Sequence, residues 1–132
     1  MATIRRFEDL QSWQKARQLA NAVYDLAGHE RFAKDFQLRD RIRGASGSVM
    51  HNIAEGFDSG SNPEFIRFLK LARRSASEVQ SESYLALDRK YITESELASA
   101  YDCSTETRKL VNGLIAYLRQ ARTNTKASTL KP

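Results

Sequence analysis

The chain has 132 residues, a formal net charge of +5 and a single cysteine, Cys103. This length indicates one domain that buries its own core, and one cysteine excludes both an intramolecular disulfide framework and a zinc site built from cysteines. The N-terminal residues lack the apolar run of a signal peptide and no window approaches the roughly 18 apolar residues of a membrane span, so we expect a cytoplasmic protein with no membrane partner.

The first predicted helix covers about residues 9–27. Its apolar side chains recur at alternating spacings of three and four, which is the stripe of an amphipathic helix: Leu10, Trp13, Ala16, Ala20, Val23 and Ala27. Gly28 is expected to end it. The following residues form a connector, from which we expect Phe32 and Phe36 to fold back onto the core.

The second predicted helix covers about residues 36–55, with one apolar face: Leu38, Ile42, Ala45, Val49 and Ile53. Its middle holds a run of small residues from Gly44 to Ser48, where each glycine costs about 1 kcal/mol relative to alanine. Two interpretations stay open. Either a neighbouring helix approaches closely here, or the helix is kinked or contacted at its backbone by another subunit or a ligand.

A turn joins this helix to the next, because Gly56, Asp58 and the Ser59–Ser61 segment favour chain reversal. The next helix restarts either with Asn62 as cap and Pro63 in the first turn, or with Ser61 and Glu64 as a capping box. We assign a structural role at this joint to four residues: Asn52, Glu55, Gly56 and Glu64. Glu55 can bond backbone amides or pair with a basic residue, and Asn52 can satisfy buried polar groups.

The third and fourth predicted helices cover about residues 63–90 and 94–120. The third carries an inward apolar stripe from Phe65 to Ala86, and a capping box formed by Thr93 and Glu96 opens the fourth. Residues 122–132 have no periodicity and are expected to be a basic disordered tail.

Four amphipathic segments with short connectors and no alternating strand pattern predict an all-α fold, an antiparallel up-down four-helix bundle over residues 1–121. Several apolar residues of the second and fourth helices lie outside a single stripe: Met50, Ile53, Tyr101, Ile115 and Tyr117. This surplus suggests a subunit interface and hence a homo-oligomer.

Several motifs together resemble the bacterial four-helix-bundle proteins encoded in 23S ribosomal RNA intervening sequences. They are Phe7-Glu8-Asp9-Leu10, Trp13-Gln14-Lys15-Ala16, Asn52-Ile53-Ala54-Glu55-Gly56-Phe57, Glu64-Phe65-Ile66-Arg67-Phe68-Leu69 and Ala86-Leu87-Asp88 before Tyr91-Ile92. The resemblance implies a homopentameric ring with no established enzymatic activity. The chain is also similar to the accessory variability-determinant proteins of diversity-generating retroelements. That similarity implies binding of RNA or DNA through basic surfaces and a protein partner.

Catalytic and metal chemistry finds no support in the residue pattern. His51 and Glu55 share a helix face, as do Glu78 and Glu82, but a di-metal bundle needs Glu-x-x-His on two helices and neither copy is present. We therefore expect no catalytic residue, no metal and no cofactor.

Basic residues are concentrated between residues 31 and 74, where nine Lys or Arg face five acidic residues. We predict a nucleic-acid surface that contacts the phosphate backbone, formed by Arg39, Arg43, Arg67, Lys70, Arg73 and Arg74. The alternative is a structural scaffold or protein-interaction module, in which the acidic segment from residue 75 to 118 meets the basic segment of another subunit.

Overall fold

The computed structural model describes residues 3–121, which form five α helices, one 3-10 helix and no strand. The prediction of an all-α protein is therefore confirmed. The bounds are η1 Phe7–Asp9, α1 Gln11–Ala27, α2 Glu30–Lys34, α3 Phe36–Phe57, α4 Asn62–Asp88 and α5 Glu94–Ala121. The tail predicted for residues 122–132 lies outside the described residues. Within the described range, no helix is both long and apolar enough to cross a bilayer.

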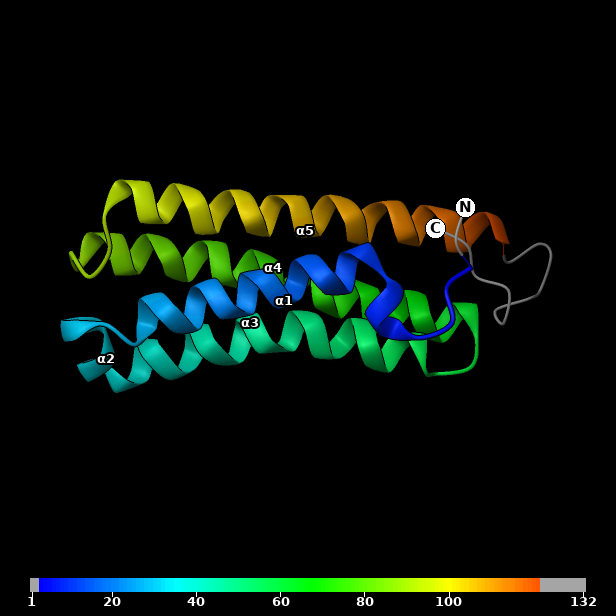
Figure 1. The fold of residues 1–132 in the computed structure, drawn as a ribbon, viewed down its shortest axis with the longest axis horizontal. Helices are drawn as coiled ribbons and strands as arrows, with labels where there is room; N and C mark the ends of the chain where they lie inside the picture. The colour runs from blue at the N-terminus through cyan, green and yellow to red at the C-terminus, as the bar shows by residue number, and fades with distance from the viewer. Residues whose placement is uncertain (1–2, 122–132) are drawn as a thin grey trace.

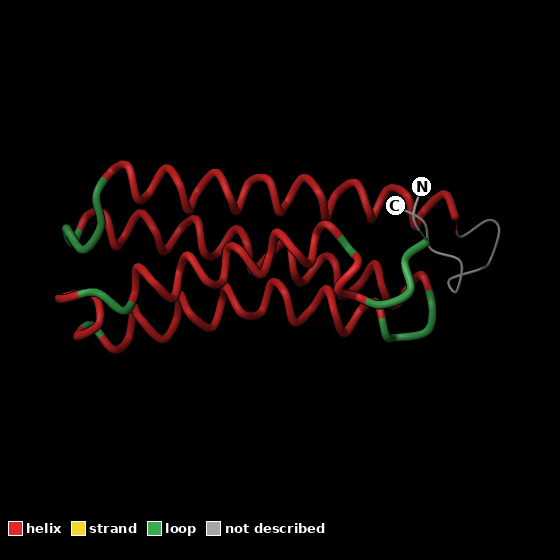
Figure 2. The backbone as a smooth tube through the Cα atoms, in the orientation of Figure 1, coloured by secondary structure: helices red, strands yellow, loops and turns green. Residues whose placement is uncertain are grey.

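The four long helices α1, α3, α4 and α5 lie side by side, and consecutive ones run in opposite directions (Figure 1). Helix α3 packs on α1 and α4, and α5 packs on α4 and α1, so each long helix has two neighbours. The connecting loops gather at the two ends of the bundle (Figure 2). The core runs between the helices and is built from the predicted stripes, with fully buried residues such as Leu19, Val49, Ile53, Leu69 and Val79.

The start of α1 differs from the prediction by two residues. The Asp9 carboxylate accepts the backbone N–H groups of Arg5 and Arg6 at 3.1 and 3.3 Å, which holds residues 7–9 in the 3-10 helix η1. Helix α1 then begins at Gln11, and Leu10 provides no side-chain cap. At its other end the N–H of Gly28 bonds Tyr24 O, as expected of a helix end at this glycine.

The connector after α1 contains the short helix α2, and its two phenylalanines behave differently. Phe32 is 1% exposed and stacks on Tyr91 at 5.3 Å, which confirms that it folds back onto the core. Phe36 is 64% exposed, so the prediction for that residue is wrong. The cause is the cap of α3: the Asp35 side chain accepts Leu38 N–H, and the helix that starts there turns Phe36 outward.

At the joint between α3 and α4, the structure selects one of the two predicted caps. Ser61 Oγ accepts the N–H of Glu64 at 3.3 Å, while the Glu64 carboxylate bonds Arg67 rather than completing a capping box. The chain reversal uses Gly60, whose φ is +94°. Gly56 instead lies inside α3, where a Cβ atom would come within 2.8 Å of Phe65 and Phe68. Its role is to let α3 and α4 approach each other closely.

The other two joint residues make few contacts there. Asn52 donates to Ser48 O and Ser48 Oγ, one turn earlier on its own helix, and Glu55 is exposed. In the small-residue run, a Cβ on Gly44 would meet nothing within 4 Å and one on Gly47 would meet only His51. A neighbouring helix therefore does not explain these two glycines, although Ser48 bonds Ser75 across to α4 at 3.0 Å.

Helix α5 begins with the predicted capping box, which is confirmed by bonds in both directions between Thr93 and Glu96. The predicted surplus of apolar side chains is largely absorbed by the bundle itself, because Ile53 and Ile115 are buried and Met50, Tyr101 and Tyr117 are half-buried. The exposed large apolar residues are different ones: Tyr24, Phe36, Tyr84 and Leu85.

Candidate nucleic-acid interface

The six basic residues predicted to bind nucleic acid form two groups. Arg39 and Arg43 lie near the start of α3, whereas Arg67, Lys70, Arg73 and Arg74 lie in the first half of α4. Because α3 and α4 run in opposite directions, the start of one helix lies beside the end of the other (Figure 1). The two groups are thus displaced along the bundle.

The two arginines of α3 are directed toward α1 and α2. Arg39 pairs with the neighbouring Asp40 at 2.9 Å and donates to Ala33 O, which neutralises much of its charge. The Arg43 guanidinium lies over the ring of Tyr24 on α1, 5.1 Å from its centroid. These contacts hold both side chains against the protein, which leaves them less free to reach a phosphate group.

The four basic residues of α4 differ in whether a carboxylate neutralises their positive charge. The carboxylate of Glu64 lies 2.6 Å from Arg67 Nε, so Arg67 is an ion-paired residue. Lys70 and Arg74 are exposed. Arg73 donates from Nη1 to Asn112 Oδ1 on α5 at 2.8 Å, and this acceptor is a neutral amide. The positive charge of Arg73 is therefore positioned without being neutralised.

Gln80 repeats this arrangement two turns further along α4. Its Nε2 donates to Tyr101 O and Thr105 Oγ1, and its Oε1 accepts from Arg108 Nη1 at 3.2 Å. A neutral amide again orients an arginine, this time on α5. Arg119 is exposed and lies two turns after Asn112, on the same side of α5. We call the set Lys70, Arg73, Arg74, Arg108 and Arg119 the α4–α5 basic face.

Two carboxylates close to this face along the helices, Glu106 and Glu82, contact basic residues of other helices. Glu106 pairs with Lys15 of α1 at 2.7 Å, and this pairing lowers the pKa of Glu106 and raises that of Lys15. Glu78 neighbours Glu82, which contacts Arg41 of α3 at 3.6 Å. Burial, followed by the charge of Glu78, raises the pKa of Glu82 to about 7, although Arg41 opposes the shift. Glu106 and Glu82 therefore do not offset the α4–α5 basic face, whereas the exposed Glu78 lies one turn after Arg74 on α4.

Arg108 and Arg119 were not predicted from the sequence, and neither were Asn112 and Gln80, the two amides that orient arginines of this face. The signal was present as a polar row at helical spacing on α5: Tyr101, Thr105, Arg108, Asn112 and Arg119. The packing of α5 against α4 decides which helix this row faces. The row alone therefore could not assign these residues to a surface shared with α4.

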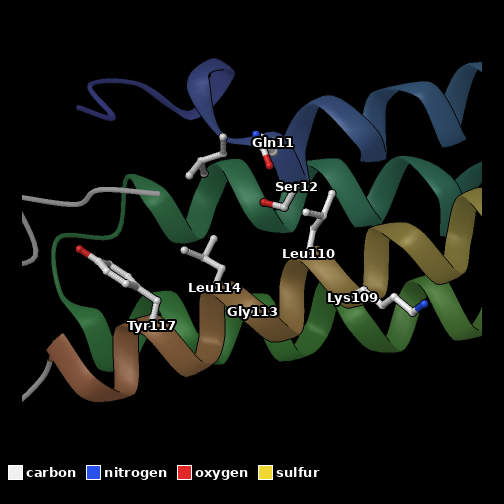
Figure 3. Close-up of a pocket in the computed structure, with 8 residues that line it drawn as sticks. Gln11, Ser12, Lys109, Leu110, Gly113, Leu114 and Tyr117 are labelled. Carbon is white, nitrogen blue, oxygen red and sulfur yellow. The ribbon is translucent and has the colours of Figure 1, made fainter. Parts of the chain in front are cut away.

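A second surface feature is an apolar groove between the start of α1 and the later half of α5, with a volume of about 220 Å³ (Figure 3). Its walls include Leu10, Leu110, Leu114 and Tyr117, and Lys109 lies at its edge. Ser12 is 3% exposed and its Oγ has no hydrogen-bond partner among the described residues. A groove of this composition suits an apolar side chain or a small ligand better than a nucleic acid.

No cluster of metal ligands is present in the part of the chain that the structure describes. His51 and Glu55 are exposed on α3, and no group of three His, Cys, Asp or Glu side chains is placed to hold an ion between residues 3 and 121. Burial raises the pKa of the Cys103 thiol, which disfavours the nucleophilic thiolate.

Residues 8–113 match the family model described as "23S rRNA-intervening sequence protein". A solved structure of a Bacteroides thetaiotaomicron protein, described as a protein with unknown function from the S23 ribosomal protein family, is similar with a TM-score of 0.72 and 27% sequence identity. The alignment covers 79% of this chain and 97% of that one. No curated protein matches the sequence.

Proposed function

Because the chain belongs to the 23S rRNA-intervening sequence protein family, we propose that it is a non-enzymatic accessory protein that binds nucleic acid through the α4–α5 basic face. Each subunit is an up-down four-helix bundle, and several copies form a homo-oligomeric ring, with five subunits as the family resemblance implies. Binding is directed to the phosphate backbone, since the face offers guanidinium and ammonium groups but no helix shaped to enter a groove.

The observation that carries this proposal is the pairing of arginines with neutral amides. Arg73 is held by Asn112 and Arg108 by Gln80, so both guanidinium groups are oriented while their charge remains available. A structural ion pair would have used a carboxylate, as Glu64 does for Arg67 and Glu106 for Lys15. Oriented and uncompensated arginines are suited to phosphate oxygens, to which they donate in bidentate geometry.

Assembly strengthens this attraction. A few phosphate contacts bind weakly at physiological salt, but copies of the same face in one ring raise the effective concentration of each further contact. The proposed contact therefore depends on both the basic face and the oligomer. This dependence is why the mass in solution is measured together with binding.

The test is a fluorescence-anisotropy titration of structured RNA and of duplex DNA at two salt concentrations, with the mass determined in the same buffers. Five phosphate contacts per subunit predict a slope of log K against log salt of about −4. The variant Lys70→Glu/Arg74→Glu changes two exposed side chains. We expect it to reduce that slope by about 2 and to weaken binding of all sequences alike, while the mass stays the same.

Lys34→Glu/Arg89→Glu is the matched control, because it makes the same change in net charge with two exposed residues outside the basic face, the last residue of α2 and the residue that follows α4. Binding should be nearly unaffected by it. If the control weakens binding as much as the α4 variant, the effect follows net charge and the assignment of this face is wrong.

A protein-interaction scaffold is the second candidate, and the apolar groove next to Leu10 and Tyr117 favours it. On this alternative, the groove receives a side chain of a partner protein or of another subunit. Leu114→Glu would place a charge in the groove, and loss of assembly with unchanged RNA affinity per subunit would support the scaffold.

A further inference from the structure

We propose that the nucleic acid recognised by the α4–α5 basic face is single-stranded, and that an unpaired base stacks on Tyr84 at the end of this face. This inference rests on the proposed function and adds a substrate class to it. It starts from Tyr84, which is 50% exposed although it is a large aromatic side chain.

Tyr84 continues the row of α4 that faces α5. Arg73 bonds Asn112, Gln80 bonds Thr105, and Tyr84 meets Tyr101 edge to face, with ring centroids 5.8 Å apart. All three contacts are made with the same side of α5, so the cations and the tyrosine pair lie along one seam. The half-exposed ring is thus fixed by a neighbouring aromatic rather than left as a mobile surface side chain.

The dimensions of the seam fit a short stretch of single strand. Arg73 and Tyr84 are eleven residues apart on one helix, which corresponds to about 17 Å at 1.5 Å per residue. With a rise of about 3.4 Å per stacked nucleotide, this length spans about five nucleotides. Arg108 lies between the two ends, hydrogen-bonded to Gln80.

Charge and ring chemistry together favour a single strand over a duplex. In a duplex the bases are stacked on each other, so an exposed ring beside the backbone gains nothing from them. In a single strand each unpaired base offers a face that stacks on an aromatic side chain while cations hold the phosphates. Two exposed carboxylates lie near the tyrosine pair, Asp102 directly after Tyr101 on α5 and Asp88 one turn after Tyr84 on α4. Their negative charge favours a base over a phosphate at this position.

The experiment compares a fluorescein-labelled, unstructured 12-nucleotide pyrimidine RNA with a duplex RNA of equal phosphate number, using the full chain at matched salt. We expect the single strand to bind more tightly. Tyr84→Ser should weaken single-strand binding about tenfold, with the salt slope and the duplex affinity unchanged. Tyr84→Phe keeps the ring and should restore the wild-type affinity.

Three results would overturn the inference. One is a Tyr84→Ser protein that binds the single strand as tightly as the wild type, and another is equal weakening on both RNAs. The third is a fall in solution mass, which would assign Tyr84 to a contact between subunits. The proposed function fails separately, when neither RNA binds in a salt-dependent way or when Lys70→Glu/Arg74→Glu has no effect.

Discussion

Gly56 is the position where the packing of α3 against α4 can be tested most directly. A Cβ atom at this position would lie 2.8 Å from Phe65 Cδ1, 2.8 Å from Phe68 Cβ and 3.3 Å from Phe65 O. Phe68 Cβ is bonded to the α4 backbone and cannot rotate away. The Phe65 ring is packed edge-on against Phe57, with centroids 6.0 Å apart. Gly56→Ala therefore forces the two helices apart.

The expected magnitude combines two opposing effects. Overpacking of a tight contact costs about 1–3 kcal/mol, whereas alanine in place of glycine within a helix stabilises by about 1 kcal/mol. Because Phe68 Cβ cannot move aside, the overpacking cost lies in the upper part of this range, about 2–3 kcal/mol, and we expect Gly56→Ala to lower the free energy of unfolding by about 1–2 kcal/mol. For a chain of this size that change corresponds to a fall in Tm of about 4–8 °C.

Gly44→Ala is the matched control, because the added Cβ meets nothing within 4 Å on the same helix. Only the helix propensity changes there, so this variant should be more stable than the wild type by about 1 kcal/mol. Both variants are compared by thermal and urea unfolding followed by circular dichroism at one protein concentration. If Gly56→Ala is as stable as Gly44→Ala, the close approach of α3 and α4 at Gly56 is not a constraint.

Two further predictions concern half-buried carboxylates, Glu82 and Asp35. The Glu82 side chain is 11% exposed, and its pKa is raised from 4.5 to about 7. The folded state therefore binds the Glu82 proton more tightly than the unfolded state does. The stability of the fold consequently falls as the pH rises from about 4.5 through 7. Glu82→Gln should raise the free energy of unfolding at pH 8 by about 1–2 kcal/mol, after allowance for solvent screening, and leave it unchanged at pH 4.5. Urea unfolding at the two pH values measures the difference, and an equal gain at both would contradict this prediction. Asp35 caps Leu38 N–H and accepts the Tyr91 hydroxyl at 2.9 Å, so Asp35→Ala should cost about 2 kcal/mol. The exposed Asp40→Ala should cost less than about 0.5 kcal/mol in the same melts, and equal losses would show that the Asp35 contacts are unimportant.

Much of the fold could be predicted from the sequence because its signals are local. The apolar stripe around Ile42 and Val49, the cap at Thr93 and the helix end at Gly28 depend on residues within one or two turns of each other. The errors arose where a distant or competing contact decided the outcome. Asp9 bonds backward and delays α1, and the cap at Asp35 turns Phe36 into solvent.

The candidate site could be predicted only in part. The basic residues of α4 were visible as a row at helical spacing, but the partner of each charge was not. Arg67 is neutralised by the Glu64 carboxylate, whereas Arg73 donates to the neutral amide of Asn112 and keeps its charge. Arg39 shows the same limit, since its pairing with Asp40 lowers its availability. Counting charges along the chain cannot separate a neutralised arginine from an oriented one.

The sequence by itself determined that this chain is helical, where its long helices lie and which stripe each helix buries, because helix periodicity and caps are short-range properties. Only the tertiary structure decided which faces meet. The packing of α5 against α4 joins Arg73 to Asn112 and Arg108 to Gln80, residues 39 and 28 positions apart in the chain. It also places Tyr84 against Tyr101. Contacts over such separations depend on the relative rotation of two packed helices, which no local pattern specifies.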